Sequence, residues 1–161
     1  MQIYVASSWR NLRQPRIIDL LRDRGHKVYD FRHPAEGDEG FSWAEIDPDW
    51  QGWDAASFSK ALRHPRADKG FALDMAALDK ADVVVLVLPC GRSAHLELGY
   101  AVGRGKPTAI LLDSQNEPEL MYKMASFITR DETVLFNWLW LIVAGRTPPK
   151  LLPQGAWRKH L

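Results

Sequence analysis

The chain has 161 residues, a length that suits one domain with a core that needs neither disulfides nor a metal ion. Its 21 Lys and Arg residues nearly balance its 20 Asp and Glu residues, so no nucleic-acid polymer is expected as a partner. The single cysteine, Cys90, excludes an internal disulfide and a cysteine-based zinc site. Because no signal sequence opens the chain and no apolar run approaches the ~20 residues that span a bilayer, we expect a cytoplasmic protein without membrane contact.

The first thirty residues predict a β-α-β unit. Residues 3–6 predict a strand, and Pro15 is typical of the first turn of a helix that Gly25 ends. Residues 27–31 predict a second strand, which a right-handed crossover joins to the first. The helix is expected to bury Ile17, Ile18, Leu20 and Leu21.

Residues 32–66 form an acidic, Trp-rich insertion in this pattern. Acidic side chains mix there with Trp43, Trp50 and Trp53, and we expect a long loop with one or two short helices. A loop of this length inside a compact domain usually covers a site or forms an interface. The alternative is a patch of tryptophans that simply packs on the core.

A helix and a buried strand follow the insertion. The helix is expected over residues 67–80, with an apolar stripe of Phe71, Met75 and Leu78. The six apolar residues 83–88 are typical of the central strand of a parallel sheet covered on both faces. The loop after this strand, residues 89–93, should therefore lie in the crevice at the carboxyl edge of the sheet, where α/β folds bind ligands.

Ser93 is expected to be the N-cap of the next helix, which leaves the amides of residues 94–96 free to hold an anion in that crevice. The remaining elements are expected to be a strand at 108–112, a helix at 117–126 and a last helix at 134–143, opened by a capping box at 129–132. The tail from Gly145 should be irregular. The whole pattern predicts a single α/β domain over residues 1–161, doubly wound, with a mostly parallel sheet of about five strands and helices on both faces.

Glu97 is the first candidate for chemistry. In the helix after Ser93 it shares a face with Ala94 and Ala101 and neighbours Leu98, so its carboxylate should point toward the sheet rather than toward water. The alternative is a first-turn glutamate that the helix dipole favours.

Asp74 repeats this pattern on the preceding helix, where it falls between Phe71 and Leu78 while Asp68 and Asp79 can face water. Two carboxylates of unequal burial suit a glycosyl transfer, in which one is the nucleophile and the other, protonated, is the acid. The alternative for Asp74 is a structural pairing with a nearby arginine.

Other polar side chains are expected near the same edge of the sheet. Tyr4 in the first strand is placed to hydrogen-bond a carboxylate, although an ordinary core tyrosine fits equally well. After that strand, Ser7, Ser8 and Arg10 supply hydroxyls and a guanidinium that suit a phosphate. His95 near a helix N-terminus is placed either to touch a substrate or to pack.

Two other chemistries have little support in the sequence. Cys90 is a poor candidate nucleophile, because a phosphatase-type loop places an arginine six residues later and this chain has Leu96 there. The five histidines show no metal-binding spacing, so we expect neither a metal site nor a cofactor.

Three blocks of sequence carry a family resemblance. They are Ile3-Tyr4-Val5-Ala6-Ser7, then Asp74 followed by Ala81-Asp82-Val83-Val84-Val85, and then Leu96-Glu97-Leu98-Gly99-Tyr100-Ala101 with Gly105-Lys106-Pro107 after it. These blocks resemble the nucleoside 2-deoxyribosyltransferase family and its relatives that hydrolyse the N-glycosidic bond of nucleoside monophosphates. The similarity runs in order over about residues 1–125.

This resemblance implies a flavodoxin-like fold and an enzyme that acts on a small nucleoside or nucleotide. It implies that Glu97 attacks the anomeric carbon to form a glycosyl-enzyme ester, that Asp74 handles the proton of the departing base, and that Tyr4 positions Glu97. A second base then takes the sugar in the transferases, and water takes it in the hydrolases.

The chain departs from the transferases at Gly91, where they usually carry an acid that helps to read the base. Arg92 and Ser93 instead suit a 5′-phosphate, as do the polar residues after the first strand, which favours a nucleotide substrate. Gly91, Arg92, Ser93 and His95 are thus expected to line the substrate site. The resemblance also implies a homodimer, for which the apolar last helix with Trp138 and Trp140 is the expected surface.

Three other functions fit the same residues. In one, Glu97 cleaves nicotinamide from NAD. In another, a non-catalytic sensor binds a nucleotide in the crevice and reports it through the Trp-rich insertion. In the third, an interaction module uses Trp43, Trp50 and Trp53 as anchors.

Overall fold

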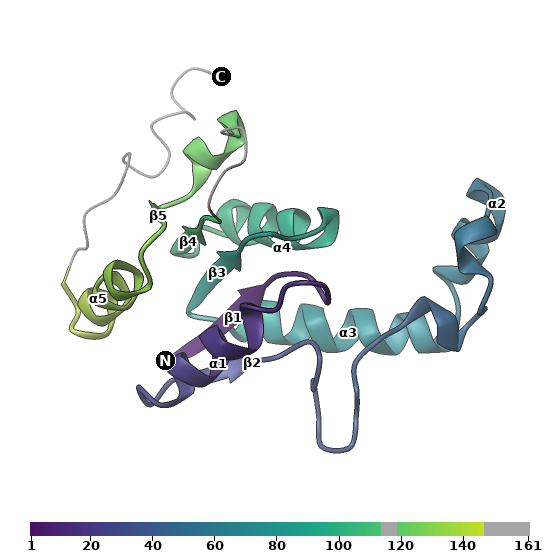
Figure 1. Ribbon diagram of the computed structural model, residues 1–161, viewed down its shortest axis with the longest axis horizontal. Coiled ribbons are helices and arrows are strands. Elements are labelled where there is room, and N and C mark those ends of the chain that lie inside the picture. The colour runs from purple at the N-terminus through teal and green to yellow at the C-terminus, as the bar shows by residue number, and fades with distance from the viewer. Residues whose placement is uncertain (114–118, 147–161) are drawn as a thin grey trace. The chain divides into compact units, whose positions relative to one another are not determined.

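The computed structural model describes residues 1–113 and 119–146, and Figure 1 shows their helices and strands. Within these residues the strands form one sheet in the order β2-β1-β3-β4-β5, and the β1–β3, β3–β4 and β4–β5 pairs are parallel. The strands are β1 (Gln2–Ala6), β2 (Lys27–Tyr29), β3 (Val83–Val87), β4 (Thr108–Leu111) and β5 (Phe127–Thr129). The predicted α/β fold with a mostly parallel sheet of about five strands is confirmed.

Helices connect these strands. The α-helices are α1 (Gln14–Arg22), α2 (Ala55–Ala61), α3 (Pro65–Lys80), α4 (Arg92–Gly103) and α5 (Glu132–Val143). Shorter 3-10 helices are η1 (Trp43–Glu45), η2 (Trp50–Gly52) and η3 (Leu120–Met124). Among the described residues, none of the helices has the length and apolar character needed to cross a membrane.

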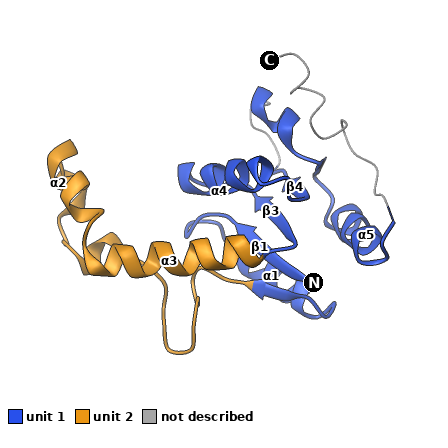
Figure 2. Ribbon diagram, turned by 180° about the vertical axis from the view of Figure 1, so that it is seen from behind, with its two compact units in different colours: residues 1–28, 81–161 blue, residues 29–80 orange. Residues whose placement is uncertain are grey.

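The chain divides into two compact units (Figure 2). Unit 1 consists of residues 1–28 and 81–161 and carries α1, α4, α5, η3 and nearly all of the sheet. Unit 2 consists of residues 29–80 and carries α2, α3, η1 and η2, so it includes the Trp-rich segment.

The core of unit 1 follows from the alternation of side chains along its strands. Ile3 and Val5 of β1, together with the odd-numbered residues of β3, pack with apolar side chains of α1 and α5. On α4 the buried residues are Ala94, Leu98 and Ala101, and this helix contacts β1, β3 and β4. All five residues of β3 are buried, which confirms the central strand expected from residues 83–88.

Some element boundaries differ from those expected. The helix predicted at 117–126 is the shorter η3, and β5 was not expected as a separate strand, because its three residues are too few to show a period. The capping box predicted at 129–132 is wrong: Thr129 ends β5, and the cap of α5 is Asp131. The Asp131 carboxylate accepts from the amides of Thr133 at 2.7 Å and Val134 at 3.2 Å. The tail beyond residue 146 lies outside the described residues.

The N-cap predicted for the helix that carries Glu97 is also wrong. Gly91, not Ser93, is the N-cap of α4, and no side chain caps this end of the helix. The helix begins two residues earlier than expected, so Ser93 lies in its first turn, where its hydroxyl cannot serve as the cap.

Three side chains differ in burial from what the sequence predicted. Leu20 is only half-buried on α1, and Phe71 is 68% exposed on α3 rather than part of a buried stripe. Trp138, expected on a dimer surface, is 2% exposed and stacks on Phe127 inside unit 1, with ring centroids 5.2 Å apart. Trp140 on the same helix is 57% exposed.

Arg66 of α3 organises the acidic segment of unit 2. Its guanidinium donates to Glu45 at 2.6 Å and to the Gly40 carbonyl, and lies 3.6 Å from Asp38. Lys69 of α3 also pairs with Asp38, at 2.7 Å. A segment that lacks sequence periodicity is thus ordered by ion pairs with α3.

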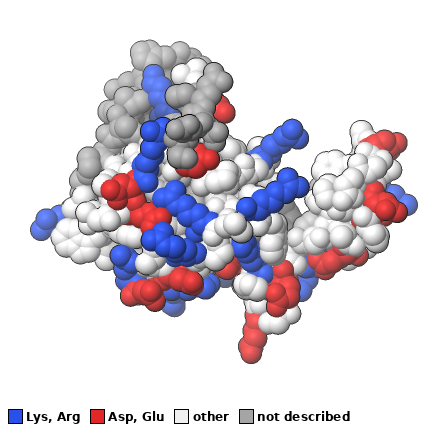
Figure 3. All heavy atoms as spheres, viewed as in Figure 1, with Lys and Arg blue, Asp and Glu red and all other residues white. Residues whose placement is uncertain are grey.

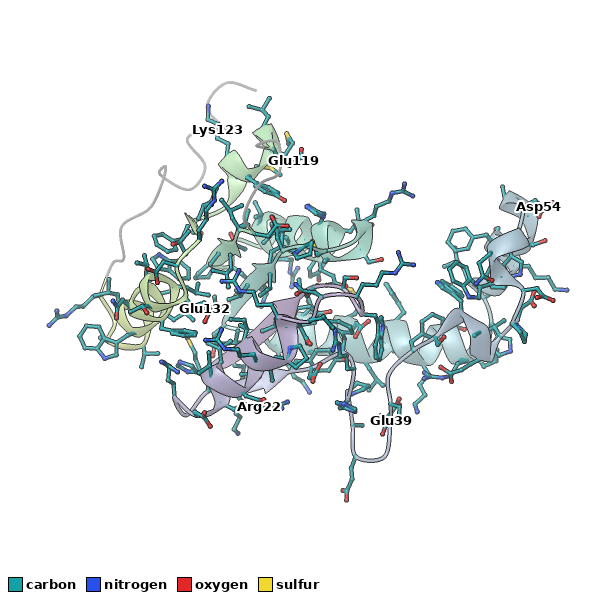
Figure 4. The ribbon with its side chains drawn as sticks, in the orientation of Figure 1. Arg22, Glu39, Asp54, Glu119, Lys123 and Glu132 are labelled. Atoms are coloured by element: carbon teal, nitrogen blue, oxygen red, sulfur yellow. The ribbon has the colours of Figure 1, made fainter. Side chains whose placement is uncertain are left out.

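An ion-pair cluster around Glu132 joins α1 to α5 in unit 1. The carboxylate accepts from Arg13 at 3.0 Å and from Arg16 at 2.6 Å, and Arg13 also donates to the carbonyl of Leu112. Burial raises the pKa of Glu132, but the hydrogen bonds from the two arginines outweigh this and hold it below its usual 4.5. Glu132 is labelled on α5 in Figure 4.

Glu132→Gln should lower the free energy of unfolding by about 1–2 kcal/mol at pH 7, a range that allows for the exposure of Arg16. Because the folded-state pKa is depressed, this stabilisation is present above the usual pKa of 4.5 and is lost as the pH falls through the folded-state value. Urea unfolding of both proteins at pH 7 and pH 3 measures the difference. An equal difference at the two pH values would contradict the charge-based explanation.

Candidate active site at the carboxyl edge of the sheet

A hydrogen-bond network fixes the carboxyl ends of β1 and β3 in unit 1. The Ser7 hydroxyl donates to the carbonyl of Val87 at 2.8 Å. The buried Asn11 amide donates to Ser7 Oγ at 2.9 Å and to the same carbonyl at 3.1 Å. Ser7 therefore links the ends of β1 and β3. The sequence predicted that its hydroxyl contacts a phosphate, but the structure uses this hydroxyl in a hydrogen bond between the two strand ends.

The loop after β3 is held by His95 in the first turn of α4. Its Nδ1 lies 3.0 Å from the Gly91 carbonyl and 3.5 Å from Cys90 Sγ. Its Nε2 lies 2.9 Å from the Tyr122 hydroxyl, and the two rings stack with centroids 5.8 Å apart. His95 thus connects the loop after β3 to η3, which fixes the imidazole in one orientation.

Glu97 lies on α4, one turn after His95. It is half-buried and follows Ala94 by three residues and precedes Ala101 by four, so it borders the buried stripe of the helix. Its charge acts on the Cys90 thiol, so the carboxylate lies within electrostatic reach of the loop after β3. Glu97 thus lies half-buried on the helix that follows the central strand, and its role in a site stays a prediction.

Tyr4 lies on the face of the sheet that α4 covers. Ile3 and Val5 belong to the core cluster with α1 and α5, so the alternation of β1 directs Tyr4 to the opposite face. Tyr4 is 1% exposed and pairs in register with Val84 of β3. This face is shared with the helix that carries Glu97.

Asp74 lies on α3 in unit 2. The Tyr29 hydroxyl at the end of β2 donates to its Oδ1 at 2.7 Å. Burial raises the pKa of Asp74 and the hydrogen bond from Tyr29 lowers it, with a net shift above its usual value. A carboxyl group in this environment retains its proton to higher pH than an exposed aspartate does.

The remaining predicted contacts are more open to water. Ser8 is half-buried, and its hydroxyl accepts from the Arg10 amide at 3.2 Å. The side chains of Arg10, Arg92 and Ser93 are exposed, with Arg92 at the first position of α4. Their side chains remain accessible to a ligand in water.

Comparisons with known proteins point to one fold. No protein-family model matches the sequence, and no curated protein sequence matches it. The solved structure of a 2-deoxyribosyltransferase from Bacillus psychrosaccharolyticus matches with a TM-score of 0.59 and 19% identity, over 94% of this chain and 100% of that one. The chain has the fold of a 2-deoxyribosyltransferase. The structure of the CMP N-glycosidase BcmB from Clostridium botulinum also matches, with a TM-score of 0.47 and 17% identity, over 88% of this chain and 100% of that one.

Two residues that interact with Cys90 and His95 in this 2-deoxyribosyltransferase fold were not expected from the sequence. Asp113 follows β4, and both Asp113 and Glu97 act on Cys90 through their charges. Tyr122 belongs to η3, where a longer helix was expected. Asp113 could have been found from the sequence, because it directly follows a predicted strand. Tyr122 could not, because its contact with His95 joins residues 27 positions apart and leaves no local pattern.

A pocket of about 460 Å³ lies between α4 and η3 of the 2-deoxyribosyltransferase fold. Its lining includes His95, Leu96, Gly99 and Tyr122, and Glu97 is not part of it. Among the residues that the structure describes, no cluster of three His, Cys, Asp or Glu side chains is arranged to hold a metal ion.

Cys90 is predicted to be an unreactive thiol. Burial, followed by the charges of Glu97 and Asp113, raises its pKa to about 12. At pH 8 we expect iodoacetamide to alkylate the folded protein at least ~100-fold more slowly than the urea-unfolded protein, because only the thiolate reacts. Mass spectrometry over time measures both rates. Equal rates would show that the thiol is neither buried nor close to the two carboxylates.

Proposed function

We propose that this protein cleaves the N-glycosidic bond of a nucleoside, a deoxynucleoside or a nucleoside 5′-monophosphate. The observation that carries the proposal is the half-buried carboxylate of Glu97 at the carboxyl edge of the central strand, beside the loop that follows β3. A half-buried carboxylate near this edge suits attack on a sugar carbon, because α/β sheets bind ligands there. The likeness in fold to a 2-deoxyribosyltransferase supports the same reaction class.

In the proposed first step, a Glu97 oxygen attacks the anomeric carbon of the sugar. The carbon–nitrogen bond breaks, its electron pair moves to the base, and the base takes a proton from Asp74. The product is a glycosyl ester on Glu97 and a free base. In the second step, water or another base attacks the same carbon, gives a proton to Asp74 and releases Glu97.

Asp74 suits the role of the acid because burial raises its pKa. An aspartate with its usual pKa would be fully ionised at neutral pH and would have no proton to give. Tyr29 holds the carboxyl in one orientation through the 2.7 Å hydrogen bond. Tyr4 is proposed to orient Glu97, since it lies on the face of the sheet that α4 covers.

Exposed and half-buried side chains near the edge supply the proposed contacts for a 5′-phosphate. Arg92 and Ser93 lie in the first turn of α4, and Ser8 and Arg10 follow β1. The amides of this helix end favour an anion as well. Gly91 and His95 complete the proposed substrate site. The exposed Trp140 on α5 is proposed as a contact in a homodimer.

Tyr29→Phe should shift the pH profile of the reaction. The Tyr29 hydrogen bond lowers the pKa of Asp74, so its loss should raise that pKa. Since the acid is active when protonated, the falling limb of kcat/KM should move to higher pH in the variant. Measuring kcat/KM from pH 5 to pH 9 tests this role, and a limb that stays in place or moves to lower pH would refute it.

The proposed function is tested by chromatography of free base. The full chain is incubated with nucleosides, deoxynucleosides, their 5′-monophosphates and NAD, each with and without an acceptor base. Release of base without acceptor indicates hydrolysis, and a new nucleoside in its presence indicates transfer. Nicotinamide from NAD alone would assign the glycohydrolase alternative. Tight binding of a nucleotide that stays intact would refute catalysis and favour a sensor.

A further inference from the structure

Unit 2 contains a second pocket, of about 330 Å³, between η1, η2 and the start of α2. Aromatic rings and one carboxylate dominate its lining, which consists of Trp43, Trp50, Trp53, Asp54, Ala55 and Phe58. Figure 4 labels Asp54 at the start of α2. The proposed glycosidic reaction uses none of these residues, so the inference below does not rest on it.

Trp43 meets two other rings of this pocket at steep angles, whereas the rings of Trp53 and Phe58 are inclined by 35° with centroids 6.5 Å apart. The Trp43 ring lies 5.5 Å from that of Trp53, at 78°, and 5.6 Å from that of Phe58, at 68°. The three tryptophans are half-buried and Phe58 is 45% exposed, so parts of the rings remain accessible. Aromatic walls inclined in this way can present ring faces to one bound group from several sides.

Two carboxylates, those of Asp47 and Asp54, lie close to the rings. The Trp53 indole donates to Asp47 at 2.6 Å, which polarises the indole and makes its ring face more negative. That bond holds the pKa of Asp47 below its usual value, and the Ser57 amide does the same for Asp54, so both carboxylates are ionised at pH 7. The α2 end of unit 2 in Figure 3 shows uncharged surface with acidic groups and a basic group at its margins, and α2 itself carries Lys60 in its last turn.

The charge of this segment is only partly neutralised. Residues 34–59 contain seven acidic residues and neither Lys nor Arg. Arg66 and Lys69 of α3 pair with Asp38 and Glu45, which do not line the pocket. Arg66 also places its guanidinium 5.5 Å from the ring centre of Phe41, which likewise lies outside the pocket lining.

We propose that this pocket binds a small organic cation with a quaternary ammonium group. Such a cation is attracted by aromatic faces within about 6 Å and loses little hydration on entering them. The carboxylates of Asp47 and Asp54 add attraction for positive charge and exclude anions. A neutral apolar ligand would gain nothing from these charges.

The proposal is tested by calorimetry with the full chain, which measures the affinity for two ligands. One is choline, and the other is 3,3-dimethylbutan-1-ol, a neutral molecule of the same shape. Choline should bind at least about tenfold more tightly, because only it has the charge that the rings and carboxylates attract. Equal affinities, or no binding of choline at 50 mM, would overturn the proposal. A peptide with trimethyllysine is the third ligand, and binding of that peptide without binding of choline would overturn the assignment to a small molecule.

Two variants locate the site. Asp54→Asn keeps an N-cap for α2 but removes the charge, and it should weaken choline binding about threefold or more. Asp68→Asn removes the same charge from an exposed position on α3 that does not line the pocket, and it should leave binding within twofold of the wild type. Phe58→Leu removes one ring and should also weaken binding. Circular dichroism confirms that each variant is folded, and equal binding by all of them would place choline elsewhere.

Discussion

Replacing Glu97 by glutamine is expected to lower the rate of base release by at least ~10³-fold, because a neutral amide cannot form the ester with the sugar. The side chain keeps its size and its half-buried place on α4, so the fold should be unchanged. Chromatography of free base, at saturating substrate and with matched protein concentrations, measures the rate.

Asp19→Asn is the control for this variant. Asp19 is an exposed carboxylate on α1, whose apolar side chains pack with Ile3 and Val5 on the face of the sheet opposite Tyr4. Its loss removes the same charge from unit 1 and should change the rate less than threefold. A Glu97→Gln enzyme as active as this control would exclude Glu97 as the nucleophile.

Trp138→Ala is expected to cost about 3–5 kcal/mol of the free energy of unfolding, the usual cost of truncating a buried tryptophan. Trp138 is 2% exposed and stacks on Phe127 with the two rings only 7° from parallel. Its indole NH has no hydrogen-bond partner among the described residues, so the loss is one of packing. Urea unfolding of the wild type and the variant measures the difference.

Trp140→Ala is the matched control, because it removes the same type of side chain from an exposed position on the same helix. Trp140 is 57% exposed, and the Arg146 guanidinium lies 5.5 Å from its ring centre. Its loss should cost no more than about 1 kcal/mol in the monomer. Equal losses for the two variants would contradict the placement of Trp138 in the core.

The central part of the fold was predictable because the strands β1, β3 and β4 have strong local signals. The unbroken apolar run of β3 predicts a buried strand. Pro15 and Gly25 mark the start and the end of the helix that the structure shows as α1. The three residues of β5 carry no such signal, since they become a strand only by pairing with Ala109 to Leu111 of β4. The start of α4 was misplaced because a glycine caps this helix without a side-chain hydrogen bond.

Part of the candidate site was predictable for the same reason. The position of Glu97 follows from its spacing with Ala94 and Ala101 within one helix. The contact of His95 with Tyr122 joins residues that are distant in the chain, so no local pattern indicates it. The hydrogen bond from Tyr29 to Asp74 is of the same kind, because the partners are 45 positions apart, and the sequence pattern allows a nearby arginine as the partner equally well.

The central claim is that the sugar becomes bonded to Glu97. Nucleosides and nucleoside 5′-monophosphates with fluorine at the 2′ position are suitable probes, because fluorine destabilises the oxocarbenium-like transition state and slows release of the ester. Intact-mass spectrometry after incubation should show one added fluorosugar per chain, located by peptide mapping on Glu97 and absent from Glu97→Gln. Release of base without an adduct, or an adduct on another residue, would contradict the claim.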